Sequence, residues 1–148
     1  MTADHLFIML ADDDEDDCMF FQDALDELSL AVSLKTVNNG EALMNYLESN
    51  LTNLPQLIFL DLNMPCKSGF ECLIELKQND MLKQLPVIIY STSSNPEVMD
   101  ELYNQGALYY IRKPAAFSKL KDVIKKAVSL INTTTGLQPK KEAFLIQP

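Results

Sequence analysis

Short apolar runs alternate with longer amphipathic stretches along the chain, and this alternation limits the folds that the sequence can adopt. Five runs of four to six residues are bounded by polar or turn residues, at positions 6–11, 32–37, 57–60, 87–90 and 107–111. The run 32–37 alternates apolar and polar side chains in part, as expected for a strand near a sheet edge. The other four are continuous, which is typical of strands buried on both faces. We therefore predict five strands.

Between these runs, apolar residues recur at helical spacing. The first such face contains Cys18, Phe21, Leu25 and Leu28. Asn39 is a candidate N-cap, Pro96 suits a first helical turn, and Gly106 suits a helix end. The fifth pattern ends near Ile131, before a helix breaker at 133–136. Five strand–helix repeats predict an α/β fold, a doubly wound, flavodoxin-like, five-stranded parallel sheet of order 2-1-3-4-5 with five helices.

Composition argues against several classes of protein. The 148 residues suffice for one ordinary domain, and a hydrophobic content of 47% favours a packed core. The formal net charge of −9 repels phosphate backbones, so we expect no direct nucleic-acid binding. The first apolar run is too short for a bilayer span and lacks a basic leader, which predicts a cytoplasmic protein without membrane insertion. Three scattered cysteines favour reduced thiols over a zinc site.

Polar residues follow four of the five strands, at the edge where doubly wound proteins bind ligands. Asp12 and Asp13 follow the first strand, Asp61 the third and Ser91 the fourth, and Lys113 follows the fifth. Carboxylates gathered there would repel one another unless a hard cation balanced their charge, so we predict a site for Mg²⁺ or Mn²⁺. An acidic site with a lysine and a hydroxyl suits phosphoryl transfer, with Asp61 as the nucleophile.

The joint order of these residues resembles the receiver family of response regulators in two-component signalling. The residues that carry the resemblance are Asp12-Asp13, Leu60-Asp61-Leu62-Asn63-Met64-Pro65, Gly69, Ser91 and Lys113-Pro114. The similar region spans about residues 5–131. The sequence around Asp61, with Lys67 and the run 90–94, is also similar to stand-alone regulators that pair with phytochrome-type histidine kinases. The resemblance implies a phosphorylation switch that assists its own phosphotransfer and dephosphorylation, and not an enzyme.

The resemblance implies roles for the residues around the phosphoryl group. Asp61 would accept that group, and Ser91 and Lys113 would bind its oxygens. Ser91 and Tyr110 would form the switch: Tyr110 turns inward when the hydroxyl moves toward the phosphate, and the outer surface is remodelled for a partner.

The resemblance also implies a set of cation ligands. Asp13 and Asp61 would bind the cation directly, and Asp12 would bind it largely through water. Asn63 would contribute its backbone carbonyl.

The phosphoryl donor is expected to be another protein, since His5 is the only histidine and begins the first strand. The resemblance implies a sensor histidine kinase or a histidine phosphotransfer protein as donor, and a further protein as downstream target. Residues 1–131 form the expected receiver domain, and 132–148 form an expected flexible tail too short for an output domain. An alternative for the tail is a docking or dimerisation segment that uses Phe144, Leu145 and Ile146.

Other interpretations remain open at this point. Residues 14–17 extend the acidic run, but at a helix start they are expected to complement the macrodipole and not to bind metal. Thr92 stands where the family usually has a very small residue, which predicts slower entry of water or donors. The chain could also be a receiver-like adaptor that acts without phosphorylation, or a flavin or nucleotide binder on the same fold. A flavin or nucleotide binder would be expected to have a glycine-rich phosphate loop, which this sequence lacks, since it has only four glycines.

Overall fold

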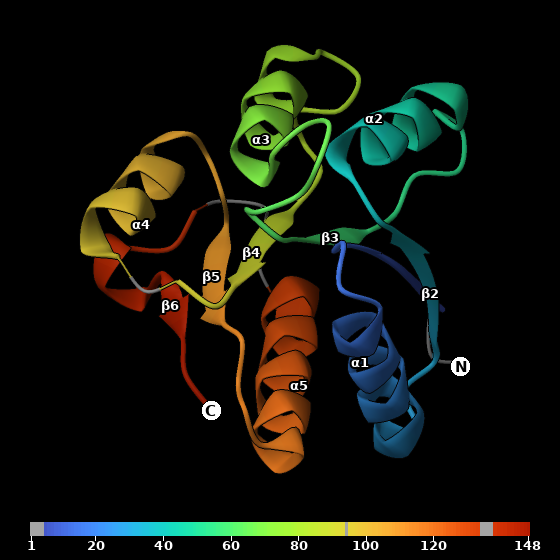
Figure 1. Ribbon diagram of the computed structural model, residues 1–148, viewed down its shortest axis with the longest axis vertical. Helices are drawn as coiled ribbons and strands as arrows, with labels where there is room; N and C mark the ends of the chain where they lie inside the picture. The colour runs from blue at the N-terminus through green and yellow to red at the C-terminus, as the bar shows by residue number, and fades with distance from the viewer. Residues whose placement is uncertain (1–4, 94, 134–137) are drawn as a thin grey trace.

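A parallel sheet lies between two layers of helices in the computed structural model, which describes residues 5–93, 95–133 and 138–148 (Figure 1). The strands are β1 Leu6–Ala11, β2 Val32–Val37, β3 Leu57–Leu60, β4 Val87–Ser91, β5 Tyr109–Arg112 and β6 Leu145–Ile146. Their order across the sheet is β2-β1-β3-β4-β5-β6, and each neighbouring pair is parallel. The predicted doubly wound fold and the order of the first five strands are confirmed.

Local capping chemistry places the helices. They are α1 Glu15–Leu28, α2 Gly40–Ser49, α3 Gly69–Gln78, α4 Pro96–Asn104 and α5 Phe117–Thr133. The Asn39 side chain accepts a hydrogen bond from the Ala42 N–H at 2.7 Å, as expected of an N-cap. Pro96 begins α4, and Gly106, with a φ of +100°, follows its end. The predicted breaker at 133–136 falls largely outside the described residues.

Each face of the sheet has its own hydrophobic core. Helices α1 and α5 cover one face, and α2, α3 and α4 cover the other (Figure 1). On the first face Phe21, Phe59 and Tyr90 pack edge to face, with ring centroids 4.9 to 6.2 Å apart. Burying one such phenylalanine contributes about 2–3 kcal/mol. None of the described helices has the length and apolar character that a bilayer crossing requires.

The C-terminal segment differs from the sequence-based expectation of five strands and a flexible tail. Residues 138–148 lie against α4 and β5, and they contain a short 3-10 helix, Lys141–Ala143, followed by β6 (Figure 1). Phe144 is 3% exposed and contacts the rings of Tyr103 and Tyr110. Its carbonyl accepts a hydrogen bond from the Tyr110 N–H at 2.9 Å. Because β6 has only two residues, sequence periodicity could not reveal this sixth strand.

We predict that Phe144→Ala lowers the free energy of unfolding by about 3 kcal/mol, because it leaves a cavity between α4 and β5. Urea denaturation followed by circular dichroism measures this change. The control is Phe20→Ala, because Phe20 is 54% exposed and its loss should cost less than about 0.5 kcal/mol. Equal stability of the two variants would contradict the packing of the C-terminal segment.

Candidate functional site

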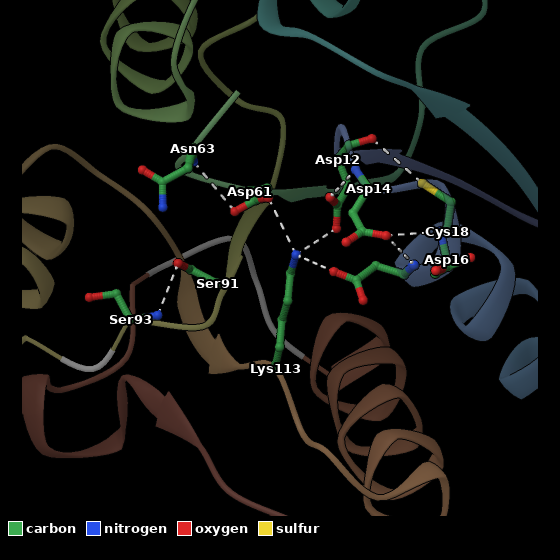
Figure 2. A network of polar contacts seen from close by, with 10 residues as sticks. Asp12, Asp14, Asp16, Cys18, Asp61, Asn63, Ser91, Ser93 and Lys113 are labelled. Atoms are coloured by element: carbon green, nitrogen blue, oxygen red, sulfur yellow. Dashed lines mark hydrogen bonds and ion pairs between the residues drawn. The ribbon is translucent and has the colours of Figure 1, made fainter. Parts of the chain in front are cut away.

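The carboxyl ends of β1, β3, β4 and β5 bring the predicted polar residues together at one edge of the sheet (Figure 2). Backbone hydrogen bonds fix these strand ends. The Asp61 N–H donates to the Ala11 carbonyl at 2.9 Å, and the Lys113 N–H donates to the Ser91 carbonyl at 2.8 Å. The side chains of Asp12, Asp61 and Ser91 are buried. The sheet therefore brings carboxylates from β1 and β3 near a lysine that follows β5.

The ammonium of Lys113 contacts three carboxylates. Its Nζ lies 2.8 Å from Asp12 Oδ2, 2.8 Å from Asp17 Oδ2 and 3.3 Å from Asp61 Oδ2. It also lies 5.3 Å from the centroid of the Tyr90 ring, which is a cation–π contact. Burial lowers the pKa of Lys113, but the hydrogen bonds and charges of the carboxylates together raise it by more, so the net shift of the pKa is upward. Lys113 is therefore a fixed positive charge.

Asp12 is costly to keep ionised. Its side chain is fully buried, and its Oδ1 accepts a hydrogen bond from the Asp14 N–H at 3.0 Å. Its Oδ2 contacts Lys113 without the geometry of a hydrogen bond. Loss of water raises the pKa of Asp12 to about 6, although Lys113 opposes the shift. Both pKa values are raised, which favours the charged form of Lys113 but the neutral form of Asp12. Lys113 has three carboxylate partners, whereas Asp12 shares one ammonium with two other acids.

The acidic residues fit the predicted cation. Asp12, Asp13 and Asp61 each offer a carboxylate oxygen, and these oxygens lie within 4.8 Å of one another. Opposite ligands of Mg²⁺ lie about 4.2 Å apart, so small side-chain movements would complete this part of a ligand shell. The buried Asp12 Oδ2, which has no hydrogen-bond partner, is the kind of atom that a cation would satisfy. The exposed Asp13 leaves one side open to water.

Asn63 lies beside this cluster. Its backbone N–H donates to Asp61 Oδ1 at 3.4 Å, and its side chain points away from Lys113 in Figure 2. The role of its carbonyl as a cation ligand stays a prediction.

Ser91 and Tyr110 are linked through one residue. The Ser91 Oγ accepts a hydrogen bond from the Ser93 N–H at 3.3 Å, and the Tyr110 hydroxyl donates to the Ser93 carbonyl at 2.6 Å. Tyr110 is fully buried, and its ring packs near that of Phe144. The inward turn of Tyr110 in response to phosphate stays a prediction.

Gly69 allows α3 to begin directly against Asp61. A Cβ at this position would lie 2.0 Å from the Asp61 backbone oxygen, which is far inside van der Waals contact. Any side chain at position 69 would therefore displace the backbone of Asp61.

Sequence reasoning missed Asp17 as part of the site, because it assigned residues 14–17 to the helix macrodipole. Asp14 does cap α1, since its side chain accepts hydrogen bonds from the N–H groups of Asp16 and Asp17 at 2.9 and 3.2 Å. Asp17, however, contacts Lys113 directly. The capping position was the available signal: with Asp14 as the N-cap, Asp17 lies in the first turn, where side chains lean toward the helix start.

Comparisons with known proteins agree with this geometry. The family model described as the response regulator receiver domain matches residues 8–125. The response regulator Rcp1 of Synechocystis sp. is 34% identical over 122 residues, which cover 80% of this chain and 81% of that protein. A probable methanogenesis regulatory protein, FilR2 of Methanothrix harundinacea, is 27% identical over 128 residues, with 84% of this chain and 83% of that protein covered.

Two solved structures are similar over most of their length. The phosphorylated cyanobacterial phytochrome response regulator RcpA superposes with a TM-score of 0.80 at 34% identity, covering 89% of this chain and 97% of that one. The Mn²⁺-bound form of Rcp1 superposes with a TM-score of 0.75 at 29% identity, covering 90% of this chain and 99% of that one. The Asp cluster and this Mn²⁺-bound relative support the predicted divalent cation.

We predict that Asp12→Asn raises the free energy of unfolding in metal-free buffer at neutral pH by about 2 kcal/mol, because the amide has no charge to desolvate. The pKa of Asp12 is higher in the folded protein, about 6, than in the unfolded chain. The stability that its protonated form contributes is therefore present below about pH 4 and is lost as the pH rises through 6.

Urea denaturation in a chelator, at about pH 4 and about pH 7, measures the effect, and the advantage of the variant should disappear at the lower pH. The control is Asp13→Asn, whose exposed carboxylate should give a smaller gain. An equal gain at both pH values would contradict the assignment to Asp12 burial.

Proposed function

Since this chain belongs to the response regulator receiver family, we propose that Asp61 accepts a phosphoryl group and that the modification changes the surface presented to a partner protein. One observation carries this proposal: the Lys113 ammonium lies 3.3 Å from Asp61 Oδ2, at the edge where the buried strands end. Receiver domains are generally switches and not enzymes, and they bind Mg²⁺ or Mn²⁺ in an acidic pocket. The positions of Asp12, Asp13 and Asp61 support the same pocket here.

The proposed donor is a phosphohistidine of a sensor kinase or of a phosphotransfer protein. An oxygen of the Asp61 carboxylate attacks phosphorus, the new O–P bond forms as the P–N bond breaks, and the bonding pair returns to the imidazole. The cation, when bound, supplies positive charge to the phosphoryl oxygens. Lys113 supplies a second positive charge, and the Ser91 hydroxyl can donate to a third oxygen. In this way the chain's own residues assist phosphotransfer and later hydrolysis.

The proposed output begins at Ser91 and ends on the α4–β5 side of the molecule. Movement of Ser91 toward the phosphate would disturb the Ser93 segment, to which the Tyr110 hydroxyl is bonded. Tyr110 in turn contacts Phe144 of the C-terminal segment. A shift of Tyr110 would therefore change how residues 138–148 lie on β5.

An adaptor that ignores phosphorylation is not favoured. The Asp61–Lys113 contact and the Asp12–Asp13–Asp61 cluster are assembled, and a phosphorylation-independent adaptor would not need them. The likeness to RcpA and Rcp1 supports a phytochrome-type histidine kinase as the candidate donor. The cytoplasmic location, the absence of direct nucleic-acid binding and the receiver boundary near residue 131 stay predictions.

We predict that the protein gains one phosphoryl group when incubated with acetyl phosphate and Mg²⁺, and that Asp61→Asn gains none, because the amide is a poor nucleophile. Intact-mass spectrometry with and without a chelator measures the gain. Asp23→Asn, which removes a carboxylate further along α1, serves as the control and should be modified like the wild type. Modification of Asp61→Asn at the wild-type rate would overturn the assignment.

Thr92 is exposed beside Ser91. We predict that Thr92→Ala raises both the phosphorylation rate and the dephosphorylation rate by a few-fold, because a branched side chain at this position would narrow the approach of donor and water to Asp61. Time courses of intact mass, with donor added and then removed, measure both rates. Unchanged rates in both directions would rule out Thr92 as a gate.

A further inference from the structure

Lys113 has one carboxylate partner that the proposed phosphoryl chemistry does not use. An ammonium has three N–H donors, and Asp12, Asp17 and Asp61 each contact Nζ. Asp12 and Asp61 also belong to the cluster that fits a divalent cation, whereas Asp17 does not. Asp17 is thus the carboxylate contacting Lys113 that has no assigned part in the site.

The three carboxylate contacts of Lys113 should change to different extents when the site binds a cation and Asp61 is phosphorylated. Phosphorylation converts one Asp61 oxygen into the bridging oxygen of an acyl phosphate and removes the full negative charge of that carboxylate. The 3.3 Å contact of Asp61 with Lys113 is also the longest of the three. A cation bound in the Asp12–Asp13–Asp61 cluster would compete with Lys113 for the Asp12 carboxylate. The 2.8 Å contact to Asp17 requires no such change, since neither cation nor phosphate would bond to this carboxylate.

We propose that Asp17 is a positioning residue for phosphoryl transfer: its carboxylate anchors the Lys113 ammonium beside Asp61 while the other two carboxylates take up cation and phosphate. This inference rests on the proposed function, because it assigns the anchor for the lysine of that site. The N–H group of Lys113 that Asp61 releases is then directed to a phosphoryl oxygen, and the lysine does not have to adopt a new rotamer.

The fold gives Asp17 a fixed position for this role. It lies in the first turn of α1, and the Asp14 cap holds its N–H at 3.2 Å. On another side of the ammonium, the Tyr90 ring lies 5.3 Å from Nζ. The side chain of Lys113 is 10% exposed. The ammonium is therefore confined between α1, Tyr90 and the two strand-end carboxylates, and it stays near Asp61 when their contacts weaken.

Asp16 provides a matched control. It is the preceding residue, carries the same charge in the same helical turn, and is exposed. Among the described residues, its side chain makes no ion pair with Lys113. Asp16→Ala therefore removes the same charge and the same interaction with the helix macrodipole, but it leaves the anchor intact.

The first measurement needs no activity. Lysine-selective ¹H–¹⁵N spectra of the metal-free protein should show a slowly exchanging Lys113 ammonium, assigned by its loss in Lys113→Met. We expect this signal to persist in Asp16→Ala and to broaden or move in Asp17→Ala. A signal that is identical in wild type and Asp17→Ala would overturn the anchor.

The second measurement follows phosphorylation by acetyl phosphate with intact mass. At saturating donor, Asp17→Ala should be slower by about tenfold and Asp17→Asn, which keeps an acceptor oxygen, by about threefold. The Mg²⁺ concentration for half-maximal rate should change by less than about twofold, since Asp17 is not a ligand. In a Lys113→Ala background, Asp17→Ala should have no further effect, because Asp17 acts through Lys113.

The outcomes separate the two proposals. A wild type that takes up no phosphate would overturn the proposed function and this inference together. Wild type, Asp16→Ala and Asp17→Ala with equal rates would overturn the role of Asp17 alone. If Asp17→Ala slowed phosphorylation by the same factor in the Lys113→Ala background as in the wild type, Asp17 would have a general structural role. That result would also overturn the inference.

Discussion

The Lys113 ammonium holds together a group of carboxylates that would otherwise repel one another. Three carboxylates, from α1 and from the ends of β1 and β3, converge on this ammonium at the edge of the sheet, and two of them are buried. The charge balance remains incomplete, because one ammonium faces three carboxylates and burial raises the pKa of Asp12 to about 6. A site with this deficit of positive charge is suited to a divalent cation, as the proposed phosphoryl transfer requires.

The parallel sheet explains why much of this site could be predicted from the sequence. When each strand is a continuous apolar run, the first polar residue after it must lie at the carboxyl edge. This rule found Asp12, Asp13, Asp61, Ser91 and Lys113, and the resemblance to the receiver family added Asn63 and Tyr110. The roles that the resemblance implied for individual residues stay predictions, whereas the fold and the family are established.

Two features could not be predicted, for different physical reasons. Asp17 belongs to an acidic helix start where several carboxylates look equivalent, and only the packing of α1 beside Lys113 distinguishes it from Asp16. The strand β6 has two residues, and its neighbour Phe144 is buried by rings of α4 and β5 that are distant in sequence. In both cases the deciding contact is tertiary, and periodicity carries no information about it.

The sixth strand covers the edge of β5, which would otherwise be open to pairing with another molecule of this chain. A sheet that ended at β5 would present free backbone N–H and C=O groups along a buried, apolar strand, which is a template for a strand of another molecule. Here the Tyr110 N–H is already bonded to Phe144, and the outer strand is very short. The opposite edge, β2, is only partly buried and carries Lys35. Both edges of the described sheet thus have features that discourage pairing with a strand of another molecule.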